Sequence, residues 1–132
     1  MRILGLMSGT SSDGLDYCDV EINIDLDYNF KFDIYDFNTI PFSDSEKNFL
    51  LSRRELETDY PNFSKEITNL FISKIEKFID DSKIDMIACH GYTVKHIDKV
   101  LSIQLIDAKL LYEKFKVPIT YNFREKDVAL GG

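Results

Sequence analysis

The first forty residues of the chain contain three successive strand patterns, and this arrangement restricts the fold more than any other feature. Ile3–Leu6 is a short apolar run, and between Leu15 and Ile24 apolar and polar residues alternate with the period of a half-buried strand. A third strand pattern begins at Phe30, after the turn-like segment Asp25–Asn29. Because short turns join neighbouring antiparallel strands, the segment predicts a three-stranded antiparallel meander.

Helix and strand patterns follow one another after this meander. The capping box Ser43–Glu46 predicts a helix over about residues 44–56. Apolar residues at helical spacing predict a second helix from near Phe63 to Ile79. We then expect a buried parallel strand over Ile84–Cys89, a strand over Val100–Leu105, a short helix capped by Asp107 and a strand over Val117–Tyr121. This order predicts an α/β fold with a mixed sheet of the ribonuclease-H-like kind, as a single domain over residues 1–132.

The charge and the cysteines restrict partners and location. The net charge of −7 over 132 residues argues against a nucleic-acid partner, because phosphate backbones require a basic surface. Cys18 and Cys89 are too few for a disulfide framework. The apolar run at the N-terminus is too short for a signal peptide or a membrane span. We therefore expect a cytoplasmic protein with no membrane partner.

Three polar segments follow predicted strands: residues 8–14, the segment that begins at His90, and residues 122–127. Ligands of α/β sheets bind beyond the carboxyl ends of strands, so we expect these segments to share one edge of the sheet. The glycines and hydroxyls of Ser8–Gly14 can offer backbone N–H groups to a phosphate. The segment lacks the G-K-[ST] signature, however, and Asp-Gly is equally typical of an ordinary hairpin turn.

Three further groups of residues have both a functional and a structural interpretation. Arg124 and Asp127 can grip an anion or form a surface ion pair. Asp13 and Asp16 can serve a two-metal nuclease or simply be solvated. The residues that could ligate one zinc, at spacings matching no standard pattern, are Cys18, Cys89, His90 and His96. We assign no metal site.

Four motifs in the same order resemble those of one family, the anhydro-N-acetylmuramic acid kinases. The matching pairs are Met7–Asp16 with M-S-G-T-S-x-D-G-x-D, Cys89–His96 with C-H-G-Q-T-V-x-H, Ser102–Asp107 with T-L-Q-I-G-D, and Asn122–Gly132 with D-F-R-x-x-D-[IV]-A-x-G-G. The resemblance implies one half of an actin-like ATPase fold, in which two ribonuclease-H-like domains enclose a nucleotide cleft. It also implies that ATP, with Mg²⁺, and water convert 1,6-anhydro-N-acetylmuramic acid to N-acetylmuramic acid 6-phosphate in peptidoglycan recycling.

The resemblance further implies site residues. Those on the ATP phosphate side are Gly9, Thr10, Ser11, Asp13 and Gly14, and those towards the sugar are His90, Thr93, Arg124 and Asp127. No catalytic residue is assigned, because the aspartate base of the family belongs to a D-T-G-P-G-N segment beyond Gly132. The chain departs from the motifs at Tyr92, Ile106 and Asn122, where the family has Gln, Gly and Asp.

We therefore expect the N-terminal part of such a kinase, truncated before its second half and inactive alone. The alternative is a non-catalytic module that binds nucleotide or phosphate, or that complements a separate C-terminal polypeptide. An apolar face meant for a second domain tends to self-associate. The sequence thus predicts either a homo-oligomer or a chain that pairs with its missing half.

Overall fold

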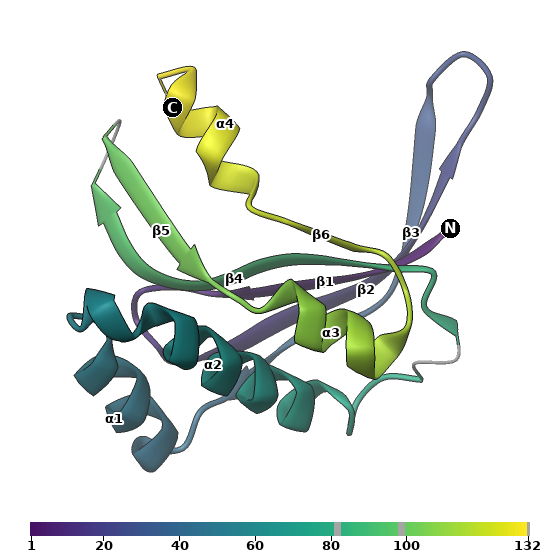
Figure 1. Cartoon of the computed structure of the whole chain (residues 1–132). Helices are drawn as coiled ribbons and strands as arrows, with labels where there is room; N and C mark the ends of the chain where they lie inside the picture. Colours follow the sequence, from purple (N-terminus) through teal and green to yellow (C-terminus); the bar gives the residue numbers. More distant parts are fainter. Residues whose placement is uncertain (81–82, 98–99, 132) are drawn as a thin grey trace.

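The computed structural model describes residues 1–80, 83–97 and 100–131. Its centre is a mixed sheet in which the strands are ordered β3-β2-β1-β4-β5, with β6 also paired to β4. Helices α1, α2 and α3 lie on one face of this sheet, whereas α4 lies towards the other (Figure 1). No helix among the described residues is long and apolar enough to cross a membrane.

The N-terminal meander is confirmed. Strands β1 (Arg2–Ser8), β2 (Gly14–Ile24) and β3 (Phe30–Pro41) pair antiparallel in chain order. The far end of the β2–β3 hairpin extends past the rest of the sheet (Figure 1). Every residue of β3 except Ile40 is exposed, so this edge strand contributes little to the core.

Strand β4 (Met86–Ile97) pairs parallel with β1 and continues well beyond the predicted strand over 84–89. The segment that begins at His90 was expected to be a loop, and this prediction is wrong. Pairing with β1 moves from Cys89 directly to Gly91, so His90 occupies an irregularity within the strand. Gly91 has a φ of 86°, which accommodates the irregularity.

The second edge of β4 has two partners. Strand β6 (Ile119–Tyr121) pairs parallel with its first half, and β5 (Leu101–Leu105) pairs antiparallel with its second half. The hairpin with β5 therefore extends β4 past the point where the apolar run ends. Long-range pairing of this kind has no local signal in the sequence.

The capping box is confirmed at the start of α1 (Asp44–Arg53), which ends three residues before the predicted boundary. The 3-10 turn η1 (Glu57–Asp59) leads into α2 (Tyr60–Ile75), which begins earlier than predicted and has Pro in its first turn. Asp107 caps α3 (Ala108–Phe115), as predicted. The apolar helical side chains that are fully buried are Leu50, Phe63, Ile67, Phe71, Ile75 and Leu111.

Residues 122–127 were expected to be a polar loop, but they begin a helix, α4 (Phe123–Ala129). Asn122 adopts the left-handed conformation with a φ of 63° and turns the chain out of β6. No residue of α4 is buried. The helix thus has no apolar face in the core, which explains why no hydrophobic period marks it.

Candidate functional site

The loop between β1 and β2, residues 9–13, is held by hydrogen bonds at both ends. The Ser8 hydroxyl donates to the Gly14 carbonyl at 2.8 Å, and the Ser12 N–H donates to the Gly9 carbonyl at 3.2 Å. Ser12 has a φ of 56°, in the left-handed region. We call this segment the β1–β2 loop. Its fixed conformation leaves Gly9 and Thr10 at the surface of the molecule.

The inner side of the β1–β2 loop is attached to the core. The hydroxyl oxygens of Ser12 and Tyr92 lie 2.7 Å apart, and both side chains are fully buried. The Tyr92 ring packs edge-on against Phe63 of α2, with ring centroids 6.1 Å apart. Strand β4 and helix α2 therefore support the loop from below.

The outer side of the loop is attached to α1 and the residue that follows it. Asp13 forms an ion pair with Lys47, and the hydrogen bond from Lys47 holds the pKa of that carboxyl below its usual value. The Arg54 guanidinium donates to the Thr10 carbonyl at 3.2 Å. Helix α1 thus positions the loop by contacts that are exposed to solvent.

A pocket of about 260 Å³ opens beside the loop. We call it the polar pocket, and its lining residues are Met7, Gly9, Thr10, His90, Thr93, His96, Ser102, Gln104 and Arg124. These residues come from the end of β1, the β1–β2 loop, β4, β5 and α4. Five of the nine residues predicted for phosphate or sugar therefore meet at one pocket.

Two nitrogen atoms of residues that line the polar pocket, His90 Nδ1 and Arg124 Nε, are buried and have no hydrogen-bond partner among the described residues. The Arg124 Nε lies 3.2 Å from an Asp127 carboxylate oxygen, but the geometry is that of an ion pair only. Burial lowers the pKa of His90, the Gly91 backbone partly opposes this, and the positive charge of Arg124 adds to the lowering. A ligand rich in oxygen atoms and hydroxyl groups would satisfy both nitrogens, since Arg124 Nε donates and His90 Nδ1 donates or accepts according to its tautomer.

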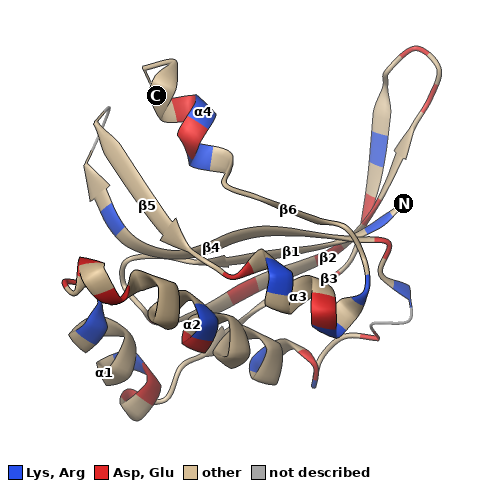
Figure 2. Ribbon diagram, in the orientation of Figure 1, with Lys and Arg blue, Asp and Glu red and all other residues tan. Residues whose placement is uncertain are grey.

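The charged residues elsewhere on the molecule do not by themselves favour the binding of an anion in the polar pocket. Figure 2 shows acidic and basic residues interspersed along α1, α2, α3 and α4. With a net charge of −7, the molecule as a whole repels anions. Anion binding in the polar pocket therefore depends on the few donors that line it.

Four predicted site residues do not line the polar pocket. Ser11 is exposed, Asp13 is engaged by Lys47, and Asp127 lies on the exposed part of α4. Gly14 is buried beneath β3, where a Cβ would lie 2.7 Å from the Ile40 carbonyl oxygen. The close approach of β3 to β2 therefore explains why position 14 is Gly.

Four residues that line the pocket were not predicted to bind phosphate or sugar, namely Met7, His96, Ser102 and Gln104. Each of them belongs to one of the four matched motifs, and this membership is the sequence signal that could have identified them as pocket residues. His96 Nδ1 lies 3.2 Å from the Ser102 hydroxyl, which in turn accepts from Gln104 at 2.5 Å. These polar side chains form the β4–β5 wall of the pocket.

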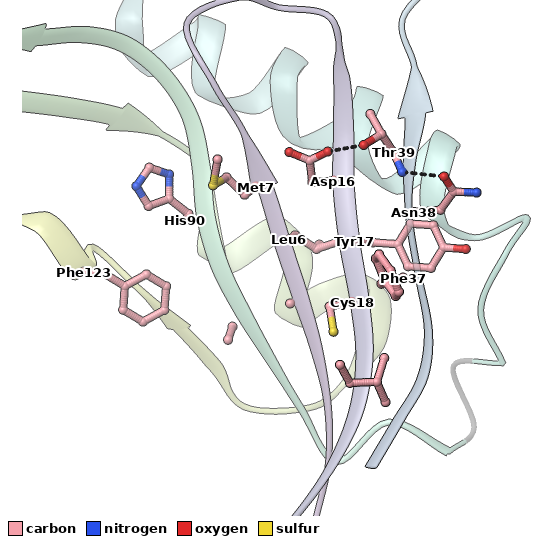
Figure 3. A pocket seen from close by; sticks show the side chains of 13 residues that line it. Leu6, Met7, Asp16, Tyr17, Cys18, Phe37, Asn38, Thr39, His90 and Phe123 are labelled. Atoms are coloured by element: carbon pink, nitrogen blue, oxygen red, sulfur yellow. Dashed lines mark hydrogen bonds between the residues drawn. The ribbon is translucent and has the colours of Figure 1, made fainter. Parts of the chain in front are cut away.

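A second pocket, of about 620 Å³, lies on the face of the sheet opposite α1, α2 and α3. We call it the sheet pocket. Figure 3 shows Met7, Cys18, Phe37, His90 and Phe123 around it, and the hydrogen bond of 2.5 Å in which Thr39 donates to Asp16. Met7 and His90 line both pockets, so the two adjoin.

The metal alternatives receive no support from the geometry. Among residues 1–80, 83–97 and 100–131, no three His, Cys, Asp or Glu side chains are grouped to hold a metal ion. Asp13 and Asp16 have different partners, Lys47 and Thr39. Burial raises the pKa of Cys89 to about 12, which disfavours the thiolate that zinc requires.

The mixed sheet, the loop at the ends of β1 and β2 and the donors of the polar pocket define an α/β protein of the type found in the N-terminal half of actin-like sugar kinases. A sequence model of the family described as anhydro-N-acetylmuramic acid kinase matches residues 1–132, and the chain belongs to this family. The resemblance seen in the four motifs is thereby confirmed.

Several curated relatives carry the name anhydro-N-acetylmuramic acid kinase. The chain is 31% identical to the protein of Sulfurimonas denitrificans and 32% identical to that of Pelagibacter ubique, in each case over 98% of this chain and 37% of the relative. It is 28% identical to the protein of a Synechococcus strain, over 100% of this chain and 38% of the relative. The chain thus spans less than two-fifths of the length of these relatives.

Proposed function

We propose that this chain forms one wall of the active site of an ATP-dependent kinase that acts on 1,6-anhydro-N-acetylmuramic acid. Gly9 and Thr10 face the phosphates of the nucleotide, whereas His90, Thr93 and Arg124 face the sugar. The observation that supports this assignment is the polar pocket, which unites these five residues from separate elements. The product is N-acetylmuramic acid 6-phosphate, in the recycling of cell-wall sugars, and a reaction that consumes ATP belongs in the cytoplasm.

Binding and orientation account for the contribution of this chain. Phosphoryl transfer depends mainly on positioning and on charge stabilisation. A Cβ at Gly9 would have no atom within 4 Å, so an oxygen atom has room to approach the backbone there. Within the described residues neither His90 Nδ1 nor Arg124 Nε has a hydrogen-bond partner, although Arg124 is ion-paired with Asp127. Arg124 Nε can donate to a ligand oxygen, and His90 Nδ1 can do so in the tautomer that carries its proton. ATP with Mg²⁺ supplies the phosphoryl group and neutralises part of its charge. We assign no residue of 1–132 as the base that activates water.

The test is a chimaera in which this chain replaces the matching segment of the Sulfurimonas denitrificans protein. We expect the chimaera to form the 6-phosphate sugar from ATP and the 132-residue chain alone to form none. Arg124→Ala should lower kcat/KM for the sugar by about a hundredfold, since a charge-assisted hydrogen bond contributes about 1.5–3 kcal/mol. The matched control is Lys126→Ala on the same helix, which lies outside the polar pocket and should leave kcat/KM unchanged.

A folded chimaera without activity would contradict the proposal, and turnover by the chain alone would show that residues 1–132 suffice. Isothermal titration with Mg-ATP distinguishes the alternative of a non-catalytic module. Binding of Mg-ATP by the chain, combined with an inactive chimaera, favours the module. Restored activity on mixing with a separately produced C-terminal portion of a relative favours a complementing role.

A further inference from the structure

Two hydroxyl groups are buried where the β1–β2 loop meets strand β4. Ser12 and Tyr92 are both fully buried, 80 positions apart in sequence, and their oxygen atoms lie 2.7 Å apart. The Tyr92 ring is itself packed edge-on against Phe63 of α2, so the phenol oxygen has little freedom to move. A buried hydroxyl that loses its partner is costly, so each of the two groups holds the other in place.

Ser12 is also in an unfavourable backbone conformation. Its φ of 56° lies in the left-handed region, which is unfavourable for a residue with a Cβ. One hydrogen bond that offsets this cost runs from its own N–H to the Gly9 carbonyl. The other is the side-chain bond to Tyr92, which within the described part of the chain is the one hydrogen bond that connects the Ser12 side chain to the core.

The conformation of Ser12 also affects the backbone that lines the polar pocket. Gly9, the acceptor of the Ser12 N–H, lines this pocket together with Thr10. Rotation of Ser12 out of its left-handed conformation would break the bond to Gly9 and move the backbone of both residues. The position of the pocket backbone therefore depends on a contact on the opposite, buried side of the loop.

We propose that Tyr92 is a positioning residue: its hydroxyl fixes Ser12 and thereby the Gly9–Thr10 backbone that faces the polar pocket. The proposal rests on the proposed function in one respect, that this backbone binds nucleotide phosphate. The family motifs have Gln at the position of Tyr92 and leave the position of Ser12 open, so they do not specify this pair of hydroxyl groups. The position acts through the loop and does not touch the ligand.

The first experiment measures amide hydrogen exchange by NMR in the 132-residue chain, without ligand. Tyr92→Phe removes only the hydroxyl and should speed exchange of the Ser12 N–H by about tenfold, the change expected for about 1.4 kcal/mol. The reference is the Ile87 N–H, which is bonded to Pro118 in the sheet and should change much less. Ser12→Ala tested in combination with Tyr92→Phe should add little to either single change.

The matched control is Tyr17→Phe. Tyr17 is also buried and its hydroxyl donates to Asp36 at 2.5 Å, but it lies on β2 away from the β1–β2 loop. We expect Tyr17→Phe to lower stability without speeding exchange of the Ser12 N–H relative to Ile87. Unchanged Ser12 exchange in Tyr92→Phe, or an equal effect from Tyr17→Phe, would overturn the proposal.

The second experiment uses the active chimaera and compares KM for ATP with kcat. Tyr92→Phe should raise KM for ATP by about fivefold or more while leaving kcat within about twofold, because the loop is displaced before the nucleotide binds. Faster exchange with an unchanged KM would overturn the positioning role. An inactive chimaera counts against the proposed function instead, and the exchange measurement still decides whether Tyr92 fixes the loop.

Discussion

At the scale of single residues, the glycines of the site region differ in what a methyl group would meet. At Gly9 a Cβ would have no neighbour within 4 Å, whereas at Gly14 it would lie 2.7 Å from both the Ile40 carbonyl oxygen and the Thr39 side chain. Both glycines belong to the same motif and were assigned to phosphate together. The close packing of β2 against β3 explains why position 14 is Gly, and of these two glycines only Gly9 lies beside the polar pocket.

This difference predicts opposite results for two alanine substitutions. Gly14→Ala should lower the free energy of unfolding by about 1–3 kcal/mol, because the methyl group clashes with β3. Gly9→Ala should change it by under about 0.5 kcal/mol and yet weaken binding of Mg-ATP about fivefold, because the methyl group fills the approach to the backbone. Urea unfolding and isothermal titration measure the two effects, and full-strength binding by Gly9→Ala would contradict the role given to Gly9.

The environment of His90 predicts that the stability of the fold depends on pH. Burial and the charge of Arg124 hold its pKa in the folded protein below the value of about 6.5 for an unfolded chain. Protonation of His90 therefore favours unfolding. The stabilising contribution of neutral His90 is fully present above about pH 6.5, and the free energy of unfolding falls as the pH drops below that value. In an NMR titration the His90 imidazole should titrate below 6.5, and inorganic phosphate in the polar pocket should raise its pKa.

The chain has only two histidines, so the titration is simple to assign. His96→Gln removes one of the two imidazole signals and identifies the other as His90. His90→Gln should flatten the loss of stability between pH 7 and pH 5. A His90 signal that titrates above 6.5 in the free protein would contradict the burial argument.

At the scale of elements, one residue of a family motif, Asp107, has a structural role at the start of a helix. Asp107 ends the segment that resembles T-L-Q-I-G-D, and its carboxylate accepts from the Leu110 N–H at 3.1 Å as the cap of α3. The Asp107 N–H donates to the buried Thr68 hydroxyl of α2 at 2.8 Å. Asp107 thus joins α2 to the start of α3, and it lies outside both pockets.

We predict that Asp107→Ala lowers the free energy of unfolding by about 1 kcal/mol, the usual loss for a helix cap. Asp107→Asn should lose much less, because its side-chain oxygen can still accept from Leu110. Thermal unfolding followed by circular dichroism measures both variants. Equal losses from Ala and Asn would show that the charge, rather than the capping hydrogen bond, determines the stability of α3.

At the scale of the whole molecule, the two faces of the sheet are unequal. Helices α1, α2 and α3 cover one face, whereas the other has the sheet pocket and exposed apolar side chains (Figures 1 and 3). Among these are Met7 at 45%, Phe37 at 71% and Phe123 at 43% exposure. Exposed apolar surface of this kind tends to be covered by a partner.

We propose that the isolated chain self-associates through this open face. Phe37→Ser should lower the apparent mass in multi-angle light scattering without lowering the melting temperature, because Phe37 is mostly exposed. Phe78→Ser is the matched control, since Phe78 is 54% exposed but does not line the sheet pocket. A wild-type chain that is monomeric throughout the concentration range would contradict this proposal.

The sequence by itself determined the order of the six strands and of helices α1, α2 and α3, the N-terminal meander, the caps at Ser43 and Asp107 and the family. These follow from local patterns, because alternation, capping and motifs depend on residues that are near one another in the chain. Only the tertiary structure decided that His90 lies within β4, that residues 123–129 form a helix, and that Tyr92 meets Ser12. Each of these depends on pairing or packing between distant segments, for which the local sequence has no periodic signal.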